Sequence, residues 1–259
     1  MRRQDILKVD KIASDNAWFV DVSVSLKSAI TDRAVKSIGN FNNENMRNQY
    51  ISLMSKMKLF LNSDRLVHPF VEWISGIVGD RSVVVVPIKR IDQNKPGSSH
   101  KYAYDAVAYG NIVGKKYYLQ DINGALRSMK AGSEGLFVFV DDFTGTGDTA
   151  MGVVEALPSV EGDFLFYSAI AMEGAAKRIG ALAPFYSHNV VQAAFGLGGG
   201  EQANYLELES EIEIGREYSM GYGQARALVG MLRTPNNTLP IFWASKKRGG
   251  GEWQPMLSR

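Results

Sequence analysis

Most of the side chains able to do chemistry in this 259-residue chain lie in one short segment. Residues 140–149 read Val-Asp-Asp-Phe-Thr-Gly-Thr-Gly-Asp-Thr. Because Gly145 and Gly147 lack a Cβ atom, the backbone there can bend tightly and approach an anion, and successive N–H groups in such a bend form a concave anion site. Three hydroxyl donors belong to the same segment: Thr144, Thr146 and Thr149. Residues 144–149 are therefore expected to form a phosphate cup.

Two adjacent aspartates precede the phosphate cup and serve a different need. A carboxylate does not face a phosphate favourably, so Asp141 and Asp142 are expected to face sugar hydroxyls or a metal ion. Each charge-assisted hydrogen bond from a hydroxyl to a carboxylate contributes about 1.5–3 kcal/mol. A phosphate cup beside two carboxylates favours a phosphorylated sugar as the ligand.

The phosphate cup needs a strand before it and a helix after it. Leu136–Val140 is a continuous apolar run, which is typical of a buried strand, and Thr149–Leu157 has the pattern of a helix. In open α/β sheets, ligands bind beyond the carboxyl ends of the strands. A helix N-terminus at the same place adds roughly half a positive charge. A strand followed by the cup and then by a helix is therefore expected to form an anion site.

Strands and helices alternate on both sides of this segment. Val83–Val86 is a β-branched run typical of a strand covered on both faces. Strands are also expected at Phe164–Ile170 and His188–Ala194, and helices at Asp121–Lys130, Glu173–Leu182 and Tyr102–Val113, the last running on into a strand. The alternation predicts an α/β fold with a mostly parallel sheet flanked by helices.

The two ends of the chain have other textures. Residues 1–80 are expected to be a helical cap, with periodic apolar faces over Met46–Leu61 and Leu66–Val78. Residues 196–259 are irregular except for a helix expected at Gln224–Leu232, so they are expected to wrap as a hood or tail. With the α/β core at residues 81–195, these three parts are expected to form one compact unit.

The segment also resembles a known signature. A strand, Asp-Asp, three residues and Thr-Gly-x-Thr is similar to the phosphoribosyl pyrophosphate signature of type I phosphoribosyltransferases, and the resemblance covers residues 82–195. It implies that the catalytic residues Asp141 and Asp142 hold ribose hydroxyls. It implies that the ligand is phosphoribosyl pyrophosphate, or a related ribose 5-phosphate or nucleotide, bound with magnesium. The residues implied to bind the 5-phosphate are Thr144, Gly145, Thr146, Gly147, Asp148 and Thr149.

The pyrophosphate loop of that family follows the first strand of the core. Here that loop would begin at Pro87 and contain Lys89 and Arg90, whose charges suit pyrophosphate, although the small residues usual in the family's loop are missing. The polar stretch Asn94–Lys101 is the alternative anion loop or catalytic lid. Its candidate ligands are Ser98, Ser99 and Lys101.

The reaction implied by the resemblance is displacement of pyrophosphate at the anomeric carbon of ribose. The acceptor is either a base or other nucleophile, in a transferase, or water, in an effector that hydrolyses the ligand. A non-catalytic sensor or partner subunit that keeps the cup without turnover is the remaining alternative. The sequence from Gly223 to Trp243, with Trp253, is similar to the ending of a phosphoribosyltransferase-like clade linked to bacterial conflict and phage-defence loci, including some retrons. Partners encoded in a defence operon are therefore expected.

Two readings compete with a phosphoribosyl site. Asp, Thr and Gly favour turns and helix caps by themselves, so residues 141–149 are open to a purely structural interpretation. Residues 142–148 also resemble the Asp-Thr-x-Gly-Ala-Gly-Asp motif of ribokinase-type sugar kinases, where the last aspartate is the base. The separate glycine-pair motif that this family carries upstream is missing.

Bulk composition excludes several classes of function. A net charge of +2 gives no electrostatic case for a nucleic-acid partner. The chain has no cysteine, which rules out disulfides, thiolate nucleophiles and cysteine-ligated metals. No apolar run approaches the ~20 residues that span a bilayer, and basic residues at the start are not followed by one. A cytoplasmic protein without a membrane partner is expected, and an oligomer is compatible with the sequence.

Overall fold

The chain folds into two units, which differ in how their segments are drawn from the sequence. The computed structural model describes residues 3–91, 97–157 and 163–259. Unit 1 combines residues 1–62 with 193–259, and unit 2 comprises residues 63–192. The boundaries expected from the sequence lay after residues 80 and 195. The helix α4 (Asp64–Val78) packs against α5 (Ser98–Ile112) and thus belongs with unit 2.

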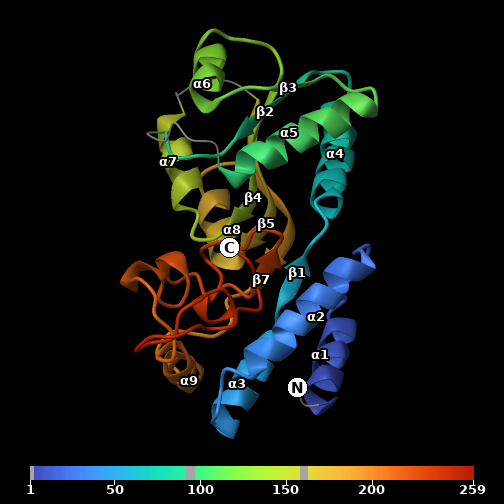
Figure 1. The fold of residues 1–259 in the computed structure, drawn as a ribbon. Coiled ribbons are helices and arrows are strands. Elements are labelled where there is room, and N and C mark those ends of the chain that lie inside the picture. The colour runs from blue at the N-terminus through green and yellow to red at the C-terminus, as the bar shows by residue number, and fades with distance from the viewer. Residues whose placement is uncertain (1–2, 92–96, 158–162) are drawn as a thin grey trace. The chain divides into compact units, whose positions relative to one another are not determined.

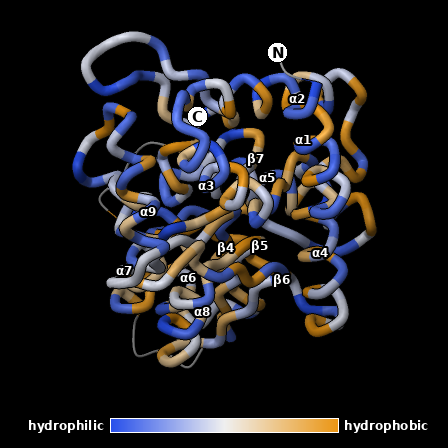
Figure 2. The backbone as a smooth tube through the Cα atoms, turned by 90° about the horizontal axis from the view of Figure 1, so that it is seen from below, coloured by the Kyte–Doolittle hydropathy of each residue, from blue (hydrophilic) through white to orange (hydrophobic). Residues whose placement is uncertain are grey.

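Unit 2 is built on a parallel five-stranded sheet with the strand order β3-β2-β4-β5-β6. This confirms the α/β fold with a parallel sheet. The central strands β4 and β5 are buried because they carry continuous apolar runs, and Figure 2 colours them as hydrophobic. The strands are β2 (Val83–Pro87), β3 (Tyr117–Leu119), β4 (Leu136–Thr144), β5 (Phe164–Met172) and β6 (Phe185–Val191).

Helices cover both faces of this sheet (Figure 1). On one face lie α4 and α5. On the other lie α6 (Ile122–Lys130), α7 (Asp148–Ala156) and α8 (Glu173–Gly180), whose apolar sides form one buried cluster with the strands. Phe139 and Phe166 stack at the centre of that cluster, with ring centroids 5.0 Å apart.

The chain reverses its direction of travel across the sheet between β2 and β4. From β2 it moves through α5 to the edge strand β3, and from β4 it moves through α7 to β5 on the other side. The helices that follow β2 and β4 therefore leave toward opposite faces. Such a switch point opens a crevice at the carboxyl ends of the two strands, which is where α/β sheets bind ligands.

Unit 1 contains four helices among the residues described and a short parallel pair of strands. The helices are α1 (Arg3–Asp15), α2 (Val24–Ile38), α3 (Glu44–Ser55) and α9 (Gly200–Glu209). The strands β1 (Lys58–Phe60) and β7 (Val229–Met231) come from the two separate parts of the unit. Three 3-10 helices complete it: η1 (Arg216–Tyr218), η2 (Tyr222–Gln224) and η3 (Pro240–Phe242).

Large aromatic side chains from both parts of unit 1 meet in its core. Tyr50 stacks on Phe242, with centroids 4.9 Å apart, and Phe41 meets Trp253 edge to face at 5.2 Å. The indole of Trp253 donates a hydrogen bond to the carbonyl of Ile241. The aromatic tail thus forms the interior of unit 1.

A strained stretch of backbone crosses unit 1 before β7. Met220, Gln224 and Arg226 all have positive φ although none is glycine. The buried carboxylate of Glu209 holds the start of this stretch by accepting hydrogen bonds from the hydroxyls of Tyr205 and Ser219 and from the backbone N–H of Met220. Such conformations cost energy and persist only where surrounding contacts impose them.

Two of the expected helices in unit 1 were wrong, and they share one cause. The helix expected over Met46–Leu61 ends at Ser55, and the helix expected over Gln224–Leu232 is absent from the described structure. Lys58–Phe60 instead pairs in parallel with Val229–Met231. Each segment has apolar residues at helical spacing, but long-range pairing overrides that local preference.

Smaller corrections apply to unit 2. The helix α5 starts at Ser98, four residues earlier than expected. The strand expected at the end of the helical segment Tyr102–Val113 instead follows Gly114, as β3. The edge strand β6 begins at Phe185 and alternates in burial, so its apolar pattern is weak. Within the described ranges, no helix is long and apolar enough to cross a bilayer.

Candidate functional site

Both aspartates of the segment lie in the last part of β4. The strand continues to Thr144, and Asp141 and Phe143 still pair with Ser168 and Ile170 of β5. The sheet therefore holds the backbone around both aspartates, which lie beyond the end of the strand expected at Leu136–Val140. The phosphate cup then turns through residues 145–147 into the first turn of α7.

Gly147 makes the turn into α7. It is the residue before the first helical turn and has φ +83°, a left-handed conformation that side chains disfavour. A Cβ atom added there would lie 3.4 Å from the Cβ atom of Ala175 and 3.5 Å from the Cδ1 atom of Ile179, both on α8. These are ordinary contact distances, so the left-handed backbone, and not a lack of space, is what favours glycine there.

Asp141 lies in an environment that opposes its charge. Burial, and then the neighbouring charge of Asp142, raise the pKa of Asp141 well above its ordinary value. The hydroxyl of Thr144 donates a hydrogen bond to its Oδ2 atom at 3.2 Å and acts in the opposite direction. A group that brought hydrogen-bond donors or positive charge to Asp141 would therefore be bound favourably.

Asp142 faces the start of another helix. The hydroxyl of Ser98, the first residue of α5, donates to its Oδ1 atom at 2.9 Å. The end of β4 therefore adjoins the N-terminus of α5 as well as that of α7. Two helix N-termini, each carrying a partial positive charge, converge at the place where the strand ends.

The segment between β2 and α5 also adjoins the end of β4. The N–H of Ile88 donates to the carbonyl of Val140 at 2.8 Å, which brings Lys89 and Arg90 next to the candidate site. Ser99, itself buried, donates its hydroxyl to the carbonyl of Ile88 at 2.6 Å and so anchors the segment. Of the expected lid, residues 94–96 lie outside the described residues.

The candidates of this second loop have different positions. Ser98 contacts Asp142, and the hydroxyl of Ser99 is already used inside the protein. Lys101 forms an ion pair with Asp105 one turn further along α5, with its side chain 74% exposed. The roles of these residues in binding pyrophosphate stay predictions.

One residue of the candidate site, Arg178, is not among the residues that the sequence singles out. Arg178 extends from α8 to the phosphate cup, donates to the carbonyl of Thr146 at 3.3 Å and forms an ion pair with Asp148. Hydrogen bonding to Arg178, and then to the hydroxyl of Thr146, lowers the pKa of Asp148. The position of Arg178 in the sequence does not predict this contact, because only the fold brings α8 beside the cup.

The acidic pair fits a magnesium ion that arrives with a phosphate ligand. Among the described residues, no group of three or more His, Cys, Asp or Glu side chains is placed to hold a metal. Magnesium in phosphate-binding proteins keeps several waters and needs only one or two carboxylates beside the substrate's phosphate oxygens. Asp141 and Asp142 can supply those carboxylates.

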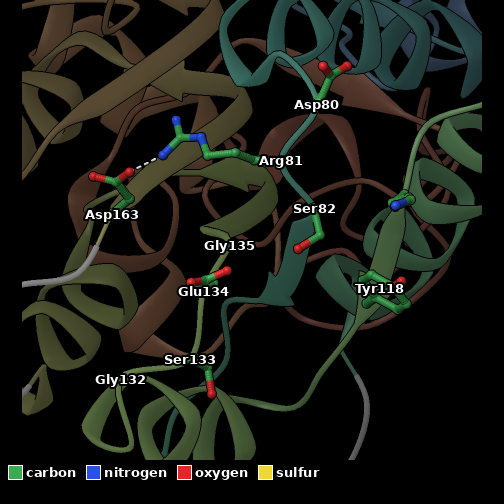
Figure 3. A pocket seen from close by; sticks show the side chains of 10 residues that line it. Asp80, Arg81, Ser82, Tyr118, Gly132, Ser133, Glu134, Gly135 and Asp163 are labelled. Atoms are coloured by element: carbon green, nitrogen blue, oxygen red, sulfur yellow. Dashed lines mark hydrogen bonds and ion pairs between the residues drawn. The ribbon is translucent and has the colours of Figure 1, made fainter.

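A separate hollow of about 780 Å³ lies at the other end of the strands from the phosphate cup (Figure 3). Arg81, Gly135 and Asp163 lie just before strands β2, β4 and β5, so this hollow is at the amino ends of the strands. Arg81 is paired with Asp163. With Asp80 and Glu134, the lining has more acids than bases and does not suit a phosphate. The acidic pair and the phosphate cup lie at the carboxyl ends of the strands.

Comparison with known proteins gives a family and several distant structures. A family model described as PRTase-CE matches residues 34–259, which include all of unit 2 and most of unit 1. No curated protein sequence matches the chain at a significant level.

Solved structures similar to the chain include three phosphoribosyltransferases. The orotate phosphoribosyltransferase of Mycobacterium tuberculosis H37Rv, in complex with inorganic phosphate, is 19% identical with a TM-score of 0.31, over 49% of this chain and 70% of that one. The hypoxanthine-guanine enzyme of Schistosoma mansoni, in complex with IMP, is 14% identical with a TM-score of 0.33, over 50% and 62%. The Helicobacter pylori xanthine-guanine-hypoxanthine enzyme is 12% identical with a TM-score of 0.33, over 49% and 84%.

Proposed function

Because the chain belongs to the PRTase-CE family and is a type I phosphoribosyltransferase-like protein, we propose that it binds phosphoribosyl pyrophosphate at the end of β4. The 5-phosphate occupies the phosphate cup, and Asp141 and Asp142 accept hydrogen bonds from the ribose hydroxyls. Lys89 and Arg90, beside the end of β4, face the pyrophosphate. The protein then transfers the phosphoribosyl group to an acceptor and releases pyrophosphate.

The geometry of the switch point is the observation that carries this proposal. Two helix N-termini and two carboxylates meet where β4 ends, and the phosphate cup closes there through Gly147. A structural turn and cap would account for the threonines and glycines of the cup. It would not account for placing Asp141, half-buried, beside Asp142 where its charge is disfavoured.

The reaction breaks the bond between the anomeric carbon and pyrophosphate and forms a bond from that carbon to the nucleophile. Positive charge develops on the ribose ring while negative charge builds on the leaving pyrophosphate. Asp141 and Asp142 orient the ring and place negative charge near it. Asp141 and Asp142 would help to hold magnesium, which would neutralise charge on the pyrophosphate. No covalent intermediate with the protein is required.

Binding is tested first, by calorimetry with phosphoribosyl pyrophosphate in the presence and absence of magnesium. Saturable binding that strengthens with magnesium is expected. Ribose without phosphate should bind far more weakly, because it lacks the contacts of the phosphate cup. If neither phosphoribosyl pyrophosphate nor ribose 5-phosphate binds at millimolar concentration, the proposed function is wrong.

Turnover is tested by pyrophosphate release, with and without a panel of purine, pyrimidine and amine acceptors. Release that requires an acceptor identifies a transferase, and release in water alone identifies a hydrolytic effector. Tight binding without release would identify a sensor or partner subunit. The resemblance of Gly223–Trp243 and Trp253 to a defence-linked clade favours an anti-phage effector that works with partners from a defence operon. This is tested by phage plating with wild-type and Asp142→Asn chains.

A sugar kinase is the weaker alternative. In that reading Asp148 would be the general base, which works best with a pKa near neutral pH. Its ion pair with Arg178 instead lowers the pKa of Asp148. Transfer of phosphate from ATP to a sugar, lost in Asp148→Asn, would nevertheless establish the kinase and exclude the phosphoribosyl reaction.

A further inference from the structure

The phosphate cup contains an acidic residue where an anion is expected to bind. Asp148 is the first residue of α7, and its carboxylate accepts a hydrogen bond from the hydroxyl of Thr146 at 2.7 Å. The same carboxylate pairs with Arg178. A helix N-terminus, a hydroxyl donor and a guanidinium are the partners that a phosphate would take.

Arg178 supplies something that the cup itself lacks. Residues 144–149 contain no lysine or arginine, so the cup by its own sequence offers only neutral donors. Arg178 reaches the cup from α8, and its Nη1 atom contacts both the carbonyl of Thr146 and the Asp148 carboxylate. A guanidinium carries several donors in a fixed plane and binds phosphate through two of them at once.

Both partners of this ion pair remain accessible to a ligand. The side chain of Arg178 is 49% exposed and that of Asp148 is 62% exposed. An exposed ion pair of this kind contributes little to folding, so it is easily exchanged. A phosphate dianion, with greater charge and three oxygens, competes well with a single carboxylate.

We propose that Arg178 is the cationic ligand of the 5-phosphate and that Asp148 holds it in place as an internal substitute for the anion. On binding, the phosphate takes over Arg178 and the Thr146 hydroxyl, and the Asp148 carboxylate turns out to solvent. The inference rests on the proposed function and adds to it the residue that selects a phosphorylated sugar over a free one.

The alternative is that Arg178 merely ties α8 to the cup. The two possibilities differ in the sign of the effect at Asp148. If Asp148 competes with the phosphate, Asp148→Asn removes the competitor and tightens binding of ribose 5-phosphate several-fold. If the ion pair is only a tie, the same substitution loosens the cup and weakens binding, as Arg178→Gln would.

The experiment is calorimetry with four variants: Arg178→Gln, Arg178→Lys, Asp148→Asn and Lys177→Gln. Ribose 5-phosphate and magnesium pyrophosphate are titrated separately. Arg178→Gln should weaken ribose 5-phosphate by about 10- to 100-fold, the range for a hydrogen bond to a charged group, with little change for pyrophosphate. Arg178→Lys should recover part of the loss. Lys177→Gln is the matched control, because Lys177 lies on the same helix and pairs with Glu173 away from the cup.

The outcomes separate the inference from the proposed function. If wild-type protein binds no ribose 5-phosphate, the proposed function fails and takes the inference with it. If wild type binds and Arg178→Gln binds as tightly as Lys177→Gln, the inference alone is overturned. Should Arg178→Gln fail to fold by circular dichroism, weaker binding by Asp148→Asn would overturn it instead.

Discussion

The two units of this protein bury their apolar side chains in different ways. Unit 2 is one continuous stretch in which each strand but the last is followed by the helix that covers it, and its candidate site lies where two such connections diverge. Unit 1 joins residues from two distant stretches through a short strand pair, an aromatic core and a strained segment. The comparison teaches that unit 2 places a disfavoured charge, that of Asp141, at its candidate site, whereas unit 1 uses strained backbone to close its own fold. The predictions below test that division.

The largest effect is expected in unit 1, from Gly221→Ala. Gly221 has φ +81°, and a Cβ atom added there would lie 2.1 Å from the carbonyl oxygen of Asn237. A left-handed alanine and the overlap together should cost about 2–5 kcal/mol of unfolding free energy. Chemical denaturation, followed by the fluorescence of Trp18, Trp243 and Trp253, measures the loss. An unchanged midpoint would mean that the segment yields easily and is not what closes unit 1.

A large effect on binding with little effect on folding is expected from Asp142→Asn. The amide oxygen of asparagine still accepts the hydrogen bond from Ser98, so the fold is kept while the charge is lost. Binding of phosphoribosyl pyrophosphate should weaken by roughly 10- to 100-fold, since a charge-assisted hydrogen bond contributes about 1.5–3 kcal/mol.

The matched control for that experiment is Asp163→Asn. Asp163 pairs with Arg81 at the amino ends of the strands, so its variant loses the same charge in the same unit at the end of the sheet away from the acidic pair. Calorimetry should show wild-type affinity for it. Equal losses in both variants would attribute the effect to net charge and not to the site.

Asp141→Asn should stabilise the folded protein at neutral pH while weakening ligand binding. The pKa of Asp141 is raised in the folded state, so its ionisation opposes folding. That penalty is absent below the ordinary aspartate pKa of about 3.9, grows as the pH rises from there to the raised folded value, and is constant above it. The thermal midpoint of the variant should therefore equal that of wild type near pH 3 and exceed it at pH 7. A lower midpoint at pH 7 would contradict the burial cost.

The smallest effect is expected from Gly152→Ala in α7. Gly152 lies inside the helix with nothing within 4 Å of an added Cβ atom. Alanine in a helix interior is favoured over glycine by about 0.5–1 kcal/mol, so unit 2 should become slightly more stable, as reported by Trp73, with ligand affinity unchanged. Destabilisation would show that α7 needs its freedom to bend beneath the phosphate cup.

The parts of unit 2 that were predictable are those encoded locally. The β-branched run at Val83–Val86 and the apolar run at Leu136–Val140 are typical of central strands whatever surrounds them, and the acids and glycines follow directly. Local patterns could not reveal that the chain reverses between β2 and β4, because strand order is set by packing. For the same reason they could not place Arg178 beside the cup.

Unit 1 was less predictable because its decisive contacts are distant in sequence. The apolar spacing around Val229–Met231 predicts a helix, and only the pairing with Lys58–Phe60 makes this segment a strand. Arg226, whose φ is positive, is likewise held by residues distant in sequence: its carbonyl accepts a hydrogen bond from the N–H of Ala194, and its guanidinium donates one to the carbonyl of Phe195.

The pairing of β1 with β7 also sets an order of events during synthesis. At ~5–20 residues per second, the ribosome needs on the order of ten seconds or more to pass from the first of these strands to the second. Throughout that interval the helices α1–α3 have exposed apolar faces, while the whole of unit 2 emerges and can fold. A nascent chain would therefore have a finished five-stranded sheet before its N-terminal helices find their partner, and those helices are where chaperones are expected to bind.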